Sequence, residues 1–198
     1  MKSLKKVMLI AIMVMVSTIS FANGNKPNVK VQSVGAKTIA LSAIGFGTGE
    51  TQIKLVDEKG TILHIERIVG KNEYSKKFDL SSLKVGTYYI EVENETSFST
   101  ISVAVSAITT NVLEDSKVVI MKPVIRRNGN LLDILLPGEN TADVEVSIYD
   151  SNLKRVFNEK VAQNSDMRRY NLSQLARGGY SIKMITEGKE FIQFVAVK

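Results

Sequence analysis

Few residues in this sequence have the type and spacing that catalysis or metal binding requires. The chain of 198 residues contains one histidine, His64, and no cysteine. His64 lies in the segment Thr61–Ile65, between apolar positions of an expected strand, and we interpret it as an exposed or edge-strand imidazole rather than a catalytic base or metal ligand. A lone histidine without cysteine excludes the usual zinc sites and a cysteine nucleophile.

Acidic residues offer the other route to chemistry. Glu91, Glu93 and Glu95 alternate along an expected strand and its exit, and paired carboxylates can hydrolyse glycosides. Asp57 and Asp150 sit at expected turns without the D-x-D-x-D-G run of a calcium loop. Nothing in the sequence indicates a pocket around these groups. We therefore predict no enzyme, no cofactor and no metal, and keep a carboxylate-dependent hydrolase as the less favoured alternative.

A glycine-rich segment and the aromatic residues provide candidate surface contacts. The run Gly45–Gly49 does not have the G-x-G-x-x-G spacing of a nucleotide loop and precedes a strand instead of a helix, so we interpret it as an inter-strand loop. Phe46 within it could be an exposed stacking ring. Tyr89 points to the opposite face of its strand from Tyr88, where it either makes an exposed aromatic contact or packs against the neighbouring domain. Phe46 and Tyr89 are thus the candidate contacts with a glycan or another protein.

The first 22 residues have the pattern of a cleavable signal peptide. Lys2, Lys5 and Lys6 precede an apolar run over residues 7–16, and Ser20–Ala22 places small residues at the cleavage positions. The apolar run is short for a bilayer span, and no second span follows. We predict cleavage after Ala22, a mature chain without an integral membrane segment, and export to the periplasm, the cell surface or the medium.

Much of the basic character belongs to this signal. The formal net charge is +6, and removing its three lysines lowers it to +3. The remaining basic and acidic residues are interspersed along the chain, whereas nucleic-acid binding requires a clustered basic stripe. We predict no nucleic-acid partner.

The pattern L-S-x-L-x-x-G-x-Y occurs twice, at Leu80–Tyr88 and at Leu172–Tyr180. Each copy precedes an alternating run, which indicates a corner between two strands. We expect the leucines to plug the core, the glycine to take a backbone angle that other residues resist, and the tyrosine to re-enter the sheet. The predicted structural corner residues are Leu80, Leu83, Gly86, Tyr88, Leu172, Leu175, Gly178 and Tyr180.

Alternating apolar and polar residues between turn signals predict an all-β chain. A second pair of matching segments, Ile53–Asp57 and Val146–Asp150, supports an internal duplication. We therefore predict two tandem Ig-like or fibronectin-III-like β-sandwiches of about seven strands each, after the cleavable signal peptide. The expected strands are Val29–Val34, Thr38–Ile44, Thr51–Val56, Thr61–Val69, Glu73–Phe78, Thr87–Glu93, Ser97–Val105, Val118–Val124, Leu131–Leu136, Val144–Tyr149, Arg155–Val161, Met167–Tyr170, Tyr180–Met184 and Phe191–Val197. The predicted division is a signal peptide over 1–22, a first domain over 23–105, a linker over 106–116 and a second domain over 117–198.

The second half resembles the C-terminal sorting domain of the Bacteroidota type IX secretion system. The likeness rests on Val146–Asp150, on Asn171–Tyr180 and on the closing segment Glu187–Lys198. Where that family has glycine in the turn after the first of these strands, this chain has Leu153. The resemblance implies a β-sandwich that an outer-membrane export machine reads, and the first half looks like a diverged copy.

Two functions follow from these observations. The first is an exported, non-enzymatic tandem β-sandwich protein that acts through surface or partner binding, for which edge strands offer β-augmentation. The alternative is a type IX secretion cargo whose second domain is a cleavable sorting tail. The predicted partners are the type IX secretion machinery, another surface protein or a glycan.

Overall fold

A computed structural model describes residues 27–137, 142–162 and 167–198. The predicted signal peptide lies outside the described residues. Within these three ranges, no helix is long and apolar enough to cross a membrane. The strands are β1 (Asn28–Gly35), β2 (Thr38–Ile44), β3 (Thr51–Asp57), β4 (Ile62–Ile68), β5 (Glu73–Asp79), β6 (Gly86–Glu93), β7 (Ser97–Val105), β8 (Thr110–Met121), β9 (Val124–Asn128), β10 (Leu131–Leu135), β11 (Val144–Asp150), β12 (Arg155–Val161), β13 (Met167–Asn171), β14 (Gly178–Thr186) and β15 (Lys189–Val197), with one 3-10 turn, η1 (Leu172–Gln174).

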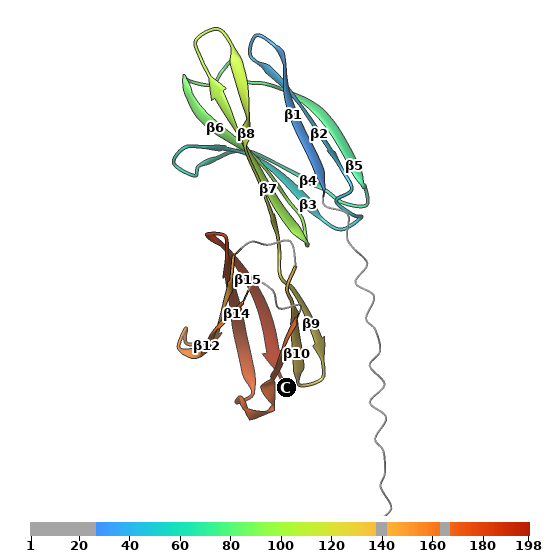
Figure 1. The fold of residues 1–198 in the computed structure, drawn as a ribbon, viewed down its shortest axis with the longest axis vertical. Helices are drawn as coiled ribbons and strands as arrows, with labels where there is room; N and C mark the ends of the chain where they lie inside the picture. The colour runs from blue at the N-terminus through green and yellow to red at the C-terminus, as the bar shows by residue number, and fades with distance from the viewer. Residues whose placement is uncertain (1–26, 138–141, 163–166) are drawn as a thin grey trace, which may run out of the picture.

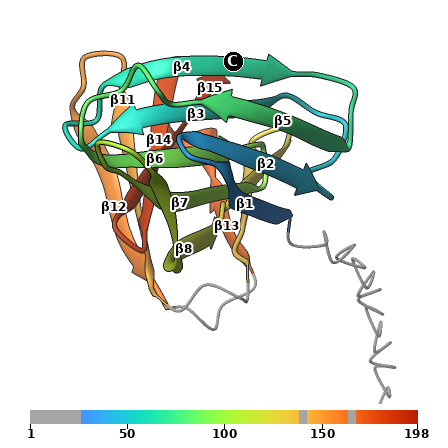
Figure 2. The same cartoon turned by 90° about the horizontal axis from the view of Figure 1, so that it is seen from above.

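The strands form four antiparallel sheets that pack as two sandwiches (Figures 1 and 2). In the first sandwich, the sheet β1-β2-β5 faces the sheet β4-β3-β6-β7-β8. In the second, β13-β10-β9 faces β12-β11-β14-β15. The two lie end to end, and the chain passes from one to the other at the end of β8 (Figure 1). This architecture confirms the predicted all-β fold of two sandwiches.

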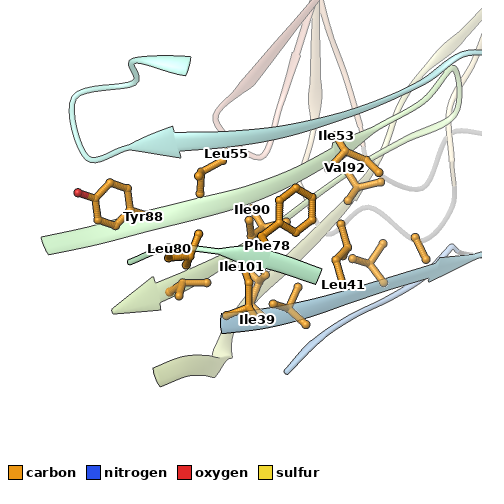
Figure 3. Packing of buried hydrophobic residues seen from close by; sticks show 14 of the residues in the cluster. Ile39, Leu41, Ile53, Leu55, Phe78, Leu80, Tyr88, Ile90, Val92 and Ile101 are labelled. Atoms are coloured by element: carbon orange, nitrogen blue, oxygen red, sulfur yellow. The ribbon is translucent and has the colours of Figure 1, made fainter. Parts of the chain in front are cut away.

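Alternation along the strands builds one apolar core in each sandwich. Strand β2 buries every second residue, as a sheet with one face against a core requires. In the first core, Ile39, Ile53 and Ile90 are at most 1% exposed, and Figure 3 shows Phe78 packed among them. The second core is built in the same way, around Leu132 and Ile182, neither of which is exposed.

The two sandwiches share details as well as topology. The hairpin β6–β7 corresponds to β14–β15 at a sequence offset of 92, and β7 and β15 both have 9 residues. Val103–Val105 and Val195–Val197 have the same sequence in this comparison. Strand β8, which pairs along β7 in the first sandwich, has no counterpart among the described residues of the second.

The expected linker over residues 106–116 is wrong. Most of it belongs to β8, which pairs antiparallel with β7 from Thr110 to Met121. The segment is polar because β8 is an edge strand that buries only two residues near its ends, Thr110 and Ile120. The expected strand Val118–Val124 is also divided, since β8 ends before Pro123, which has no N–H for a ladder.

The two corners have the same hydrogen bonds. The Tyr88 hydroxyl donates to the Lys84 carbonyl oxygen at 3.0 Å, and the Tyr180 hydroxyl donates to that of Ala176 at 2.8 Å. Each hydroxyl thus reaches four residues back along the chain, which is the geometry of a tyrosine corner. Both rings are buried, at 8% and 7% exposure, and Figure 3 places Tyr88 at the end of the core beside Leu80.

The leucines of each corner differ in burial, and the glycines differ in conformation. Leu80 and Leu172 are buried, whereas Leu83 and Leu175 are half-buried against the cores. Gly178 has a φ of 154°, but Gly86 has no positive φ. The expectation that both glycines supply an unusual backbone angle is therefore wrong for Gly86, where the backbone already runs as strand β6.

The turns after β3 and β11 are also alike, with one difference. The Asp57 carboxylate accepts backbone N–H bonds at 2.9 and 2.8 Å, and Asp150 accepts the equivalent pair at 2.9 and 3.0 Å. Gly60 has the left-handed conformation in the first turn, with a φ of 83°. In the second turn Leu153 takes that conformation, at 61°, although its side chain resists it.

Candidate functional site

The two predicted contact residues, Phe46 and Tyr89, differ in burial. Phe46 is only 5% exposed and packs in the first core, while its carbonyl oxygen accepts a hydrogen bond from the Asn94 side chain at 3.0 Å. The interpretation of Phe46 as an exposed stacking ring is therefore wrong. In the sequence Phe46 lies between Gly45 and Gly47, which both have left-handed backbone conformations. The loop that they form directs the Phe46 ring into the core. Tyr89 is half-buried on the outward face of β6.

A hydrogen bond from a tyrosine to a glutamate, here called the polar tie, joins the two sheets at the same edge of both sandwiches. The Tyr74 hydroxyl donates to the Glu66 carboxylate at 3.0 Å between β5 and β4, and Tyr170 donates to Glu159 at 3.0 Å between β13 and β12. Burial and the adjacent carboxylate raise the pKa of both tyrosines. The Lys76 ammonium, at 2.7 Å, leads the contacts that lower the pKa of Glu66. Because the tie is duplicated, we interpret it as structural.

His64 lies at this edge in the first sandwich. Its side chain is 44% exposed, and its Nε2 atom is 3.7 Å from the Glu66 carboxylate. The ring also makes an edge-on contact with Phe78 at 5.7 Å between ring centres. Within the described residues there is no group of three or more histidine, cysteine, aspartate or glutamate side chains that could hold a metal ion.

The junction between the sandwiches is built from both of them. Phe98 on β7 and Ile120 on β8 are 4% exposed, and they pack in the core of the second sandwich, not the first. The Lys189 ammonium of β15 lies 3.7 Å above the Phe98 ring, and that of Lys122 lies 5.4 Å from the Phe191 ring. Cations on each side of the junction thus lie over aromatic rings of the other side.

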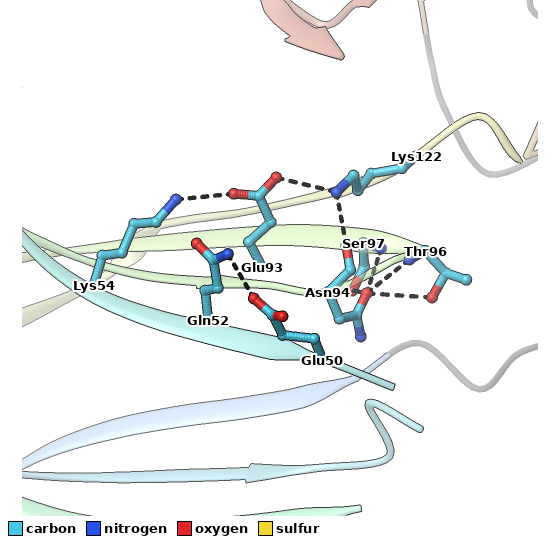
Figure 4. A network of polar contacts seen from close by, with 8 residues as sticks. All are labelled: Glu50, Gln52, Lys54, Glu93, Asn94, Thr96, Ser97 and Lys122. Carbon is cyan, nitrogen blue, oxygen red and sulfur yellow. Dashed lines mark hydrogen bonds and ion pairs between the residues drawn. The ribbon is translucent and has the colours of Figure 1, made fainter. Parts of the chain in front are cut away.

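A polar network holds the link between β8 and β9. The Lys122 ammonium donates to Glu93 at 3.0 Å and to the Asn94 carbonyl oxygen at 2.7 Å, and Lys54 donates to the other oxygen of Glu93 at 3.1 Å (Figure 4). Burial raises the pKa of Glu93, but these two lysines outweigh it, so the pKa lies below its ordinary value. The network therefore contributes its full stability at pH values above the ordinary pKa of glutamate, and loses it as pH falls through the lowered pKa.

A cleft lies beside this network at the junction. It has a volume of about 550 Å³, and its walls include Glu93 and Lys122 from one side and Phe191 and Gln193 from the other. Glu93 and Lys122 are paired with each other, at 3.0 Å. The cleft therefore does not present Glu93 as a free carboxylate for hydrolysis.

The outward face of β15 carries an exposed apolar feature that the sequence patterns did not predict. Phe194 is 77% exposed and Ile192 is 52% exposed. At the offset of 92, the first sandwich has Ser102 and Thr100 at these positions. The fold thus does not require apolar side chains there. A position-by-position comparison of the two sequence copies would have revealed these apolar residues, because their counterparts in the first copy are polar.

The fold and its surfaces define a tandem β-sandwich protein with a paired polar junction and exposed apolar residues on edge strands such as β4 and β15. A family model described as "Secretion system C-terminal sorting domain" matches the chain twice, over residues 33–106 and 129–198. The chain therefore belongs to this family of sorting domains. The match confirms the resemblance of the second half and of the first half as a diverged copy.

No curated protein matches the chain. Among solved structures, the BSP domain of a biofilm-associated protein is 14% identical, with a TM-score of 0.30, and the match covers 87% of this chain and 30% of that one. A two-domain fibronectin type III segment of chicken tenascin is 11% identical, with a TM-score of 0.31 and coverages of 85% and 97%. Domains MG0-NIE-MG1 of Escherichia coli alpha-2-macroglobulin are 10% identical, with a TM-score of 0.30 and coverages of 87% and 64%. The assignment of two sandwiches rests on strand pairing, not on these likenesses.

Proposed function

We propose that the protein is a cargo of the type IX secretion system, exported to the cell surface or the medium, and that it has no enzymatic activity. The observation that carries this proposal is the family match over residues 129–198. Glu93 in the junction cleft is paired with Lys122, and His64, the one histidine, does not line that cleft, which favours a binding or surface role over a hydrolase. The partner that this function requires is the type IX secretion machinery.

We propose that the second sandwich is the sorting domain that the secretion system recognises. A sorting domain of this family acts C-terminal to what it exports, and the second copy follows the first in the chain. The first sandwich is then the passenger. In it, β8 covers the outer edge of β7, the strand that corresponds to β15. Export machinery that binds the last hairpin of a sandwich would find the outer edge of β7 covered in the first sandwich. The equivalent edge of β15 would be accessible in the second.

The cellular location of the full chain tests this function. In a host with type IX secretion, we expect the chain at the surface or in the medium, where protease added to intact cells cuts it. In a matched strain that lacks the outer-membrane translocon, we expect it in the periplasm, protected from the protease. A periplasmic protein without a sorting domain serves as the control in both strains. An identical distribution of the chain in the two strains would contradict the proposal.

We further propose that the second sandwich stays attached after export. The link between the sandwiches is Lys122-Pro123, in which Pro123 is buried and the Lys122 side chain is only 17% exposed. Loss of the second sandwich would expose Phe98 and Ile120, which pack in its core. Such an apolar end favours aggregation, so the passenger benefits from keeping its tail.

A further inference from the structure

The backbone edge of β15 is open where the equivalent edge of the first sandwich is occupied. Strand β7 pairs along its outer edge with β8, whereas no strand within the described residues pairs with the outer edge of β15. An unpaired edge strand presents a row of free N–H and C=O groups that another strand can pair with. Because the first sandwich accepts an antiparallel strand at this place, the architecture accommodates one in the second.

The turn between β14 and β15 identifies which backbone groups of β15 are free. Its two residues, Glu187 and Gly188, have φ values of 49° and 73°, and the residues that flank such a turn bond to each other across the hairpin. The odd-numbered residues of β15 therefore direct their N–H and C=O groups toward β14. The even-numbered residues direct theirs to the open edge.

Two hydrogen bonds agree with this assignment. The Ser102 N–H, equivalent to that of Phe194, donates to the Ser116 hydroxyl of β8 at 2.9 Å. The Arg127 guanidinium donates to the Ala196 carbonyl oxygen from outside the sheet. Each bond engages an even-numbered residue, Ser102 of β7 or Ala196 of β15, on the side of the strand that faces away from its hairpin partner.

The side chains along this edge are apolar in the middle and charged at the ends. Phe194 and Ile192 are 77% and 52% exposed, and Ala196 is exposed beside them. Glu190 lies near the start of the strand and Lys198 follows its end. The charges have opposite sign and lie equally far from Phe194 in sequence. A strand with this arrangement is complementary to its own antiparallel copy.

We infer that β15 pairs antiparallel with β15 of a second copy of this chain, about a two-fold axis at Phe194. In this register, Phe194 lies opposite Phe194, Ile192 opposite Ala196, and Glu190 opposite Lys198. All these residues direct their backbone N–H and C=O groups to the open edge, so each pair can exchange hydrogen bonds once Arg127 releases the Ala196 carbonyl oxygen. An axis at Ile192 would instead place Glu190 opposite Phe194 and leave Lys198 beyond the paired strand. The opposite charges therefore select the axis at Phe194.

The rest of the chain is compatible with this pairing. The first sandwich lies at the Lys189 end of β15, since Lys189 contacts Phe98. An antiparallel dimer therefore places the two first sandwiches at opposite ends. Glu190 is already paired with Lys183 of its own sheet, and Lys198 of the second copy would approach its other side. Arg127 must release the Ala196 carbonyl oxygen when the second copy binds.

A cysteine substitution tests the register directly, because the chain has no cysteine of its own. At the two-fold axis, hydrogen-bonded residues have Cα atoms about 5.5 Å apart, within the range of about 4.4–6.8 Å that a disulfide requires. We expect Phe194→Cys in the mature chain to form a disulfide-linked dimer under mild oxidation. The two copies of Ile192 would be offset by about 13 Å along the strands, so Ile192→Cys should form no disulfide. Leu153→Cys, at a site that is 80% exposed, controls for random collision.

A second measurement does not depend on thiols. Sedimentation of the unmodified mature chain should show a reversible dimer whose population rises with concentration, since a single strand pair is a small interface. Phe194→Ser, which restores the residue of the first sandwich, should weaken the dimer about tenfold or more. Val118→Thr on exposed β8 is the matched control and should leave it unchanged. A chain that stays monomeric, or a Phe194→Cys variant that links no faster than Leu153→Cys, would overturn the inference and leave the edge to a strand of another protein.

Discussion

Phe98→Ala is expected to destabilise the second sandwich although Phe98 belongs to a strand of the first. The ring is 4% exposed and packs in the second core, under the Lys189 ammonium. Removing a buried phenylalanine ring leaves a cavity and typically costs about 3–5 kcal/mol. Hydrogen exchange should show faster exchange of the amides in β10 and β14, and denaturant unfolding should show the loss in stability.

The location of the effect distinguishes a shared core from two independent domains. Thr100→Ala, on the same strand but with a half-buried side chain on the outward face, should change the stability by no more than about 0.5 kcal/mol. If Phe98→Ala accelerated exchange only in β6 and β7, the two sandwiches would be independent, and the assignment of Phe98 to the second core would be incorrect.

Tyr180→Ala should be the most damaging change within the corner of the second sandwich. The ring is 7% exposed, and its hydroxyl donates to the Ala176 carbonyl oxygen at 2.8 Å. Loss of the ring creates a cavity, for which we expect about 3–5 kcal/mol of destabilisation. Thermal unfolding followed by circular dichroism would measure it as a lower melting temperature.

A conservative change separates packing from hydrogen bonding at this corner. Tyr180→Phe keeps the ring and loses one hydrogen bond, for which we expect about 1 kcal/mol. Tyr88→Phe should cost a similar amount in the first sandwich, because its hydroxyl makes the equivalent bond at 3.0 Å. An unchanged melting temperature for Tyr180→Ala together with lost export would instead identify the corner as a recognition site.

The sequence predicted those parts of the fold that local pattern determines. Alternation in β2 and β6, the Asp57 turn and the paired corners all have side chains whose placement follows from the strand period or from turn chemistry. Residues 110–117 of β8 were missed because an edge strand with few buried residues has no such period. This strand is held by its pairing with β7, and the residues of β8 alone do not indicate that β7 is its partner.

The surface features could not be predicted in the same way. Phe46 is turned into the core by a loop whose conformation no period encodes, and Phe98 crosses into the core of the other sandwich. The exposure of Phe194 becomes informative only beside Ser102, its polar counterpart in the first sandwich. Each of these depends on which segments meet in three dimensions, and single-sequence patterns do not contain that information.

The intact mass of the exported protein, measured on chains released without protease from the surface of intact cells, tests both the proposed export and the shared junction. We predict a surface form in which peptides from β1–β8 and from β9–β15 belong to one uncut chain. This result requires that the chain reaches the surface and that the second sandwich stays with the first. A chain confined to the periplasm, or a surface form that ends near Lys122, would contradict this account.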